Sequence, residues 1–337
     1  MLVEIGLGGL VWTTGEADWA TTAHVVVAAF GLAASLLLVA ASFRGVAGPS
    51  GCVRDYVTLT KPRIMTLLLL TGAGGMFVGT RGAPSAGLFT VTMLGLGLAC
   101  GGASALNHVL DRDIDRHMRR TDRRPVASDR VPAARALEFG LALSAFSFVL
   151  LASFVNVLTA VLALVGNLFY VLVYTRWLKR TTPQNIVIGG AAGAVPPLVG
   201  WAAATGNLTL PALFLFLIVF FWTPPHFWAL ALLIKRDYAA ANVPMLPVVR
   251  GDDTTARQIL LYSLALVPIT VLPFLTDTLG AVYLGSALVL SGAFVLLAWR
   301  LRRQTTPDRA RVLFHFSLAY LALLFVSMAI DPFVTLA

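Results

Sequence analysis

The chain has 337 residues, of which 58% are hydrophobic and only 12% are charged, and its mean hydropathy is +0.83. These values exclude an ordinary soluble domain and predict an all-α polytopic membrane protein. The formal charge of +9 would suit a nucleic-acid ligand. Because membrane topology accounts for where the basic residues lie, we expect no nucleic-acid partner.

Ten apolar stretches are each long enough to cross a bilayer once, at about 18 to 22 residues per span. They cover about residues 23–43, 64–80, 86–108, 136–155, 157–174, 186–204, 210–234, 259–276, 279–299 and 312–330. Met1 to Ala20 contains no Lys or Arg, which favours a retained first helix over a cleaved signal peptide. The linker Gly45 to Gly51 follows that helix. We therefore expect residues 1–50 to be an extension with one extra transmembrane helix, and residues 51–337 to be the main transmembrane domain.

The basic side chains fall on one side of this topology. Of the 25 Lys and Arg residues, 24 lie in loops on that side and only Arg81 lies on the other. By the positive-inside rule the basic side is the cytoplasm, which places both termini outside. We expect a multi-pass protein of the cell (inner) membrane with cytoplasmic polar loops, and with the lipid bilayer and a diphosphate as partners.

An amide and two carboxylates follow at four-residue spacing where the 86–108 stretch ends. If the helix continues, Asn107, Asp111 and Asp115 advance by only about 40° per step and share one face. Asp113 falls about 200° from Asp111 and points elsewhere. Three hard oxygen ligands where a membrane helix meets water suit Mg²⁺ held jointly with a substrate phosphate. The spacing therefore predicts a catalytic magnesium site.

Basic residues on the same side as this motif are candidates for binding the diphosphate, because their cations pair with phosphate oxygens. The candidates are Lys61, Arg63, Arg120, Arg124, Lys179 and Arg180. The alternative for each is a topology determinant whose charge reaches water at the membrane interface.

The 210–234 stretch contains Pro224 and Pro225, which we expect to break the helix locally. His226 follows them as an ionisable group inside the membrane, and such a group is a functional candidate by default. It could contact haem or handle protons, and the alternative is a histidine hydrogen-bonded within the bundle. In the next polar loop Asp237 could add a metal ligand, but Ala241 stands four residues later where a second acid would be needed.

Six segments resemble the intramembrane aromatic prenyltransferase (UbiA-type) superfamily, and within it the branch that farnesylates protohaem IX. The segments are Asn107-x3-Asp111-x3-Asp115-x2-Met118-x-Arg120-Thr121-x2-Arg124-Pro125, Leu59 to Ile64, Tyr174 to Gly190, Pro224 to Trp228, Asp237-Tyr238 with Pro244 to Pro247, and Phe314 to Ser317. The resemblance covers about residues 54–330.

The resemblance implies nine helices around a central cavity open to lipid. It also implies that magnesium and farnesyl diphosphate bind at Asn107, Asp111 and Asp115, and that a farnesyl group passes to a vinyl group of haem b with addition of water. The product would be haem O, which serves haem-copper oxidase cofactor synthesis, with haem A synthase as a candidate partner. His226, Tyr238 and His315 are the candidate contacts of the haem acceptor. Asp237 alone matches the superfamily's second acidic motif.

Two other functions fit parts of the pattern. The metal motif alone would also suit a prenyltransferase for a quinone-type aromatic acceptor. Intramembrane polar groups and broken helices also mark transport paths, so a transporter or a haem-delivery subunit is the alternative outside the enzymes.

Overall fold

The computed structural model describes residues 53–335, and this part of the chain is helical with no strand. The predicted all-α class is confirmed there. The expected extra helix at 23–43 and the domain boundary near residue 50 lie outside the described residues.

Nine helical spans within residues 53–335 are long and apolar enough to cross a membrane. They are α4 (Pro62–Thr80), α5 (Ala86–Leu110), α7 (Ala133–Phe154), the continuous run α8 (Val157–Leu168), η1 (Phe169–Leu178) and α9 (Lys179–Thr181), the pair α10 (Asn185–Gly193) and α11 (Val195–Thr205), α12 (Leu210–Leu233), α14 (Leu246–Leu275), α15 (Ala281–Arg303) and α16 (Pro307–Thr335). These spans match the last nine predicted ones in number and order, so the chain is a multi-pass membrane protein.

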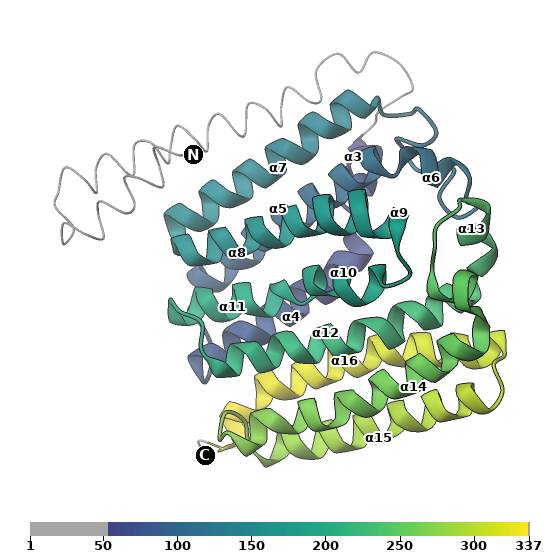
Figure 1. Ribbon diagram of the computed structural model, residues 1–337. Helices are drawn as coiled ribbons and strands as arrows, with labels where there is room; N and C mark the ends of the chain where they lie inside the picture. The colour runs from purple at the N-terminus through teal and green to yellow at the C-terminus, as the bar shows by residue number, and fades with distance from the viewer. Residues whose placement is uncertain (1–52, 336–337) are drawn as a thin grey trace, which may run out of the picture.

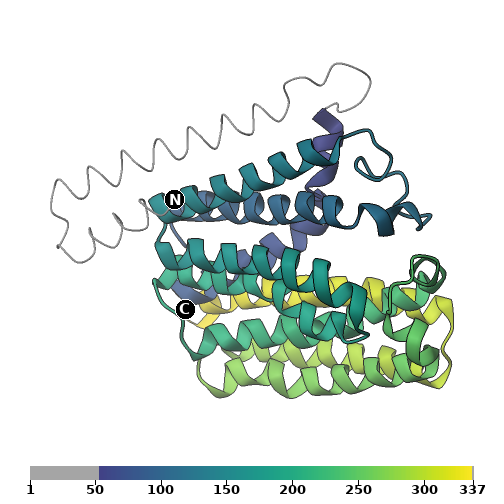
Figure 2. The same cartoon turned by 45° about the horizontal axis from the view of Figure 1, so that its top comes forward.

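Three short helices lie outside the spans: α3 (Val53–Leu59), α6 (Arg112–Arg116) and α13 (Lys235–Ala240). Figures 1 and 2 show the long helices running side by side, with α6, α9 and α13 gathered at one end of the bundle. Helix α16 finishes at the other end (Figure 1). Segments far apart in the sequence therefore meet at one polar end of a largely apolar bundle.

Helices α4 and α11 pack backbone to backbone. A Cβ atom added to Gly200 would lie 1.8 Å from the carbonyl oxygen of Gly72, and one added to Gly75 would lie 2.3 Å from that of Pro197. Small residues drive such close packing in membranes, where helices gain little from the hydrophobic effect. This contact ties α4, which begins beside the polar end, to the middle of the bundle.

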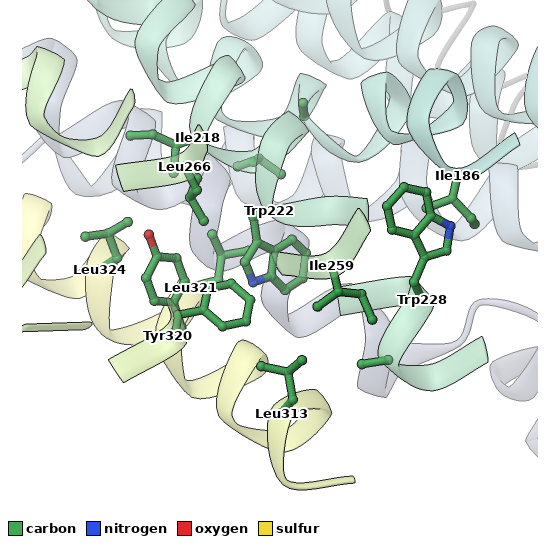
Figure 3. Close-up of a cluster of buried hydrophobic side chains, with 14 of the residues drawn as sticks. Ile186, Ile218, Trp222, Trp228, Ile259, Leu266, Leu313, Tyr320, Leu321 and Leu324 are labelled. Carbon is green, nitrogen blue, oxygen red and sulfur yellow. The ribbon is translucent and has the colours of Figure 1, made fainter. Parts of the chain in front are cut away.

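The largest buried apolar cluster joins α12, α14 and α16. Figure 3 shows Trp222 and Ile218 of α12 facing Leu321 and Leu324 of α16, with Leu266 of α14 beside them. The indole nitrogen of Trp222 donates to the Ser317 carbonyl oxygen at 2.8 Å, so the one polar atom of that ring is satisfied. These helices form a rigid wall of the bundle.

The predicted break at Pro224 and Pro225 is wrong, because α12 runs without interruption from Leu210 to Leu233 with both prolines inside it. Membrane helices tolerate proline where hydroxyl side chains and neighbouring helices compensate the freed carbonyl groups. Thr223, directly before the prolines, donates its hydroxyl to the Val219 carbonyl oxygen at 2.8 Å.

The loop predicted at 235–253 is largely helical. Helix α14 begins at Leu246 and kinks at Gly251, whose φ of 78° lies in the left-handed region that glycine adopts without strain. Sequence periodicity missed this start because the first turns of α14 are more polar than its membrane-spanning part.

Candidate functional site

The predicted triplet keeps its helical spacing across the end of α5. The Asp111 N–H donates to the Asn107 carbonyl oxygen at 2.9 Å, and the Asp115 N–H donates to that of Asp111 at 2.7 Å. All three side chains are buried, whereas the Asp113 side chain is 63% exposed. The prediction that Asn107, Asp111 and Asp115 share a face that Asp113 does not share is confirmed.

Cations from three distant segments converge on this triplet. Lys61 Nζ donates to Asn107 Oδ1 at 2.7 Å, and Lys179 Nζ donates to Asp111 Oδ2 at 2.5 Å. Arg124 Nη1 donates to both carboxylate oxygens of Asp115, each at 2.8 Å. The Asn107 amide also donates to Asp111 Oδ2 at 2.7 Å. The structure therefore forms one buried cluster of an amide, two carboxylates and three cations.

The π-helix η1 brings Lys179 to this cluster. In η1 the Lys179 N–H donates to the Tyr174 carbonyl oxygen five residues earlier, and π-type turns of this kind are concentrated at functional sites. On the same segment, Thr175 Oγ1 accepts a hydrogen bond from the Asn107 amide at 3.1 Å. Sequence reasoning missed Thr175. The signal that could have found it is the Tyr174-Thr175 pair five and four residues before Lys179.

Lys61 is held in an unusual conformation. Its φ of 50° and ψ of 59° are left-handed, which non-glycine residues adopt at a cost of about 1 to 3 kcal/mol and mostly at functional sites. Burial lowers the pKa of its ammonium group to about 7, with the charges of Arg124 and Lys179 acting in the same direction and that of Asp111 opposing them. A strained, half-buried lysine of this kind is suited to binding an anion.

One buried carboxylate oxygen in the cluster has no hydrogen-bond donor. Asp111 Oδ1 has none, and Arg180 Nη2 lies 3.9 Å from it. A carboxylate oxygen left free beside a second carboxylate fits the coordination of Mg²⁺, which takes one or two protein carboxylates and completes its shell with water and substrate phosphate. Within residues 53–335 no group of three or more His, Cys, Asp or Glu side chains forms a metal site. The donor set therefore fits a magnesium ion shared with a diphosphate, and does not form an all-protein metal cage.

Arg180 lies at the edge of this cluster. It donates to both Asp113 carboxylate oxygens at 2.7 Å and to the Leu110 carbonyl oxygen at 2.6 Å. These hydrogen bonds from Arg180 are the main reason that the pKa of Asp113 falls to about 2. Asp113 thus supports an arginine next to the site from outside it.

Tyr238 of α13 shares the electrostatic environment of the triplet. Burial raises the pKa of its phenol, while the charges of Arg120 and Arg124 act against that rise and the charge of Asp111 adds to it. Tyr238 and Arg120 are therefore close enough to the cluster to feel its charges. Arg120 is exposed and makes no hydrogen bond to any described residue, which leaves its guanidinium group free for an anion.

Three other predicted residues are not joined to the cluster by any hydrogen bond or ion pair among the described residues. Arg63 is exposed at the start of α4, and Asp237 has no side-chain partner within residues 53–335. His315 is exposed on α16, where its Nδ1 lies 2.8 Å from the Arg311 carbonyl oxygen.

His226 lies inside α12, buried between two aromatic rings. Its imidazole stacks on Trp222 with ring centroids 4.3 Å apart and on Phe314 at 5.0 Å. Its Nδ1 lies 2.6 Å from the hydroxyl oxygen of Ser317 on α16. The expected alternative of a histidine hydrogen-bonded within the bundle is therefore observed for one of its two nitrogens.

The chain belongs to the UbiA prenyltransferase family, which residues 68–325 match. Its fold is that of an intramembrane prenyltransferase.

Among its relatives are proteins named protoheme IX farnesyltransferase. That of Symbiobacterium thermophilum is 55% identical over 281 residues, which cover 83% of this chain and 94% of the relative. That of Synechocystis is 52% identical over 82% of this chain and 89% of the relative. That of Roseiflexus sp. (strain RS-1) is 54% identical over 84% of this chain, but the match spans only 53% of that longer protein.

Solved structures share the fold at low sequence identity. A digeranylgeranylglyceryl phosphate synthase structure has a TM-score of 0.69 and 17% identity, covering 83% of this chain and 98% of that one. A UbiA homologue from Archaeoglobus fulgidus bound to DMAPP and Mg²⁺ has a TM-score of 0.57 and 16% identity, covering 82% and 99%. These likenesses establish the architecture of the nine spans.

Proposed function

We propose that this chain transfers the farnesyl group of farnesyl diphosphate to a vinyl group of haem b, with addition of water, to give haem O. The observation that carries this proposal is the buried cluster in which Asp111 Oδ1 has no hydrogen-bond donor among three cations. The name shared by relatives about half identical in sequence supports farnesyl diphosphate and haem as the substrates.

Asp111 and Asp115 would hold magnesium together with the diphosphate, and Asn107 would orient Asp111 through its amide. When bound, magnesium would neutralise negative charge on the diphosphate as it leaves. Lys61, Lys179 and Arg124 are paired with the amide and the carboxylates. The incoming anion would therefore take over their hydrogen bonds, while the carboxylates turn to the cation.

The proposed farnesyl transfer needs the cations close to the diphosphate group that leaves. The bond between farnesyl C1 and the diphosphate oxygen breaks, and the electron pair leaves with the diphosphate. The vinyl electron pair of haem then forms the new carbon–carbon bond. Water adds to the carbon next to the pyrrole and releases a proton. The buried cations stabilise the leaving charge, and the apolar bundle limits premature capture of the farnesyl cation by water.

The other candidate functions gain no specific support. A quinone-type acceptor is not named among the relatives reported above, and neither is transport. The six diphosphate candidates stay proposals, with Lys61, Arg124 and Lys179 best supported by their contacts. Tyr238, His226 and His315 stay candidates for the haem side.

The positive-inside pattern supports a polar end that faces the cytoplasm, in the cell membrane. Farnesyl diphosphate would then enter from the cytoplasm, while haem and the farnesyl chain would enter from the bilayer. Haem A synthase would consume the product.

The direct test incubates the purified protein with haem b, farnesyl diphosphate and Mg²⁺, followed by mass spectrometry of the porphyrins. We expect haem that has gained one farnesyl group and one water molecule, with no such product when a chelator is added. Parallel incubations with a quinone precursor should give no prenylated product. Prenylation of the quinone precursor with haem untouched would overturn the proposal.

A further inference from the structure

The hydrogen-bond geometry around His226 favours a proton on Nδ1 over one on Nε2. The Ser317 hydroxyl donates its only hydrogen to the Phe314 carbonyl oxygen at 2.6 Å. The same hydroxyl oxygen lies 2.6 Å from His226 Nδ1, so it can only accept there. Nδ1 therefore carries the hydrogen, and Nε2 of the neutral ring holds an unshared electron pair.

The surroundings of the ring leave Nε2 open in one direction. Trp222 covers one face of the imidazole and Phe314 stacks on it as well, with interplanar angles of 15° and 23°. Nδ1 is used by Ser317, and Nε2 has no hydrogen-bond partner among the described residues. A third ring, that of Phe227, lies edge-on to the imidazole with ring centroids 5.1 Å apart. The His226 residue as a whole keeps 7% of its surface exposed. A partner can therefore approach only in the ring plane, which is the direction of the Nε2 electron pair.

We propose that His226 Nε2 is an axial ligand of the iron of the haem substrate, and that Ser317 is the positioning residue that holds the imidazole in the ligating tautomer. Neutral imidazole is the commonest protein ligand of haem iron, and its other nitrogen usually donates to a fixed acceptor that sets the tautomer. Here the acceptor is on α16 and the ligand on α12, so the packing of the two helices sets the direction of the iron bond.

This inference rests on the proposed function, because it takes haem as the acceptor. The experiment therefore titrates the purified full chain with haem and with iron-free protoporphyrin IX, and follows the Soret band. The two porphyrins share their apolar contacts and propionates, and only haem can bind Nε2 through iron. The wild type should bind haem more tightly than protoporphyrin IX.

His226→Ala should move the Soret band and reduce haem affinity to that of protoporphyrin IX. Ser317→Ala should lower haem affinity by about 10- to 100-fold, the usual effect of losing the group that orients a metal-binding histidine. Its affinity for protoporphyrin IX should not change. Ser317→Thr, which keeps the hydroxyl, should restore the wild-type Soret position.

Ser327→Ala is a matched control. Ser327 lies on the same helix, is buried, and donates to the carbonyl oxygen three residues earlier, that of Leu324, at 2.8 Å. No histidine within residues 53–335 forms a hydrogen bond with the Ser327 hydroxyl. The haem and protoporphyrin affinities of this variant should match the wild type. Unchanged farnesyl diphosphate affinity in all variants would exclude a general loss of structure.

Two outcomes distinguish failure of the iron-ligation proposal from failure of the proposed function. If the wild type makes farnesylated haem but His226→Ala keeps its Soret position and haem affinity, iron ligation by His226 is wrong and the proposed function stands. If the wild type binds no haem and prenylates a different acceptor, the proposed function and this inference both fall.

Discussion

Buried carboxylates at the two ends of the bundle are satisfied in different ways. On α16, Asp331 accepts hydrogen bonds from the backbone N–H groups of Gly280 at 2.5 Å and Tyr283 at 2.9 Å, at the start of α15. At the polar end Asp111 is paired with Lys179, and its Oδ1 has no donor. The last turns of α16 lie at the end opposite α6 and α13 (Figure 1).

The difference separates a carboxylate held by backbone groups from one that we propose binds a ligand. Backbone N–H groups at a helix start cannot exchange partners without unwinding the helix, so Asp331 fixes α16 to α15. Side-chain cations can rotate toward an incoming anion. Pairing of buried acids with lysine and arginine, with one carboxylate oxygen free, is therefore what the proposed binding of a metal–diphosphate complex requires.

The largest expected effect is on catalysis by Asp111. We expect Asp111→Ala to lower the rate of farnesyl haem formation by about 100- to 1,000-fold, the usual loss when one preorganised electrostatic contact is removed. The measurement is product formation per amount of inserted protein. Asp122→Ala is the control, because Asp122 is exposed in the same loop and has no side-chain partner within residues 53–335. A normal rate in Asp111→Ala would contradict the distinction between a ligand-binding Asp111 and a structural Asp331.

Ligand binding should stabilise the polar end through the same oxygen. Mg²⁺ with farnesyl diphosphate at about 100 times its dissociation constant should raise the free energy of unfolding by about 2.7 kcal/mol. We expect a higher thermal unfolding midpoint for the wild type and little shift for Asp111→Ala. Asp331→Ala should keep the full shift. Loss of the shift in Asp331→Ala would show that the two ends are coupled.

Lys179→Ala should weaken diphosphate binding more than it alters folding. A hydrogen bond to a charged group contributes about 1.5 to 3 kcal/mol, so we expect KM for farnesyl diphosphate to rise about 10- to 100-fold. Steady-state kinetics measure this change. Arg176→Ala is the matched control, because Arg176 is exposed on the same π-helix and makes no side-chain hydrogen bond to any described residue. An equal rise in both variants would point to a general loss of positive charge.

The smallest effect is expected for Asp331. Asp331→Ala should destabilise the fold by about 1 kcal/mol, as loss of a helix cap does, with no change in KM or in rate per folded molecule. Thermal unfolding measures it. Asp308→Ala is the comparison at the start of α16, where an exposed ion pair with Arg311 should contribute less. A catalytic defect in folded Asp331→Ala would contradict a purely structural role.

Local periodicity predicted the nine described spans and the common face of Asn107, Asp111 and Asp115, because both depend on residues within a few turns of each other. The contact of Lys179 with Asp111 joins residues 68 positions apart and depends on how the helices pack. The sequence alone made Lys179 a candidate for diphosphate binding, but it gave no reason to prefer Lys179 to Arg63.

Two local features also could not be predicted from the hydropathy pattern. Pro224 and Pro225 predict a break in an isolated helix, but neighbouring helices and the Thr223 hydroxyl keep α12 continuous. The π-helix left no trace in hydropathy, since its ten residues are as apolar as an ordinary membrane span. Its effect is on the direction in which Lys179 points.

That π-helix makes the polar end sensitive to chain length as well as to residue type. Leu172 is 55% exposed on η1, so replacing it with another apolar residue should be harmless. Deleting it would move each later residue of η1 back by one helical position and turn Lys179 away from Asp111. Deletion of Leu172 would therefore inactivate the protein, although every charged side chain would still be present.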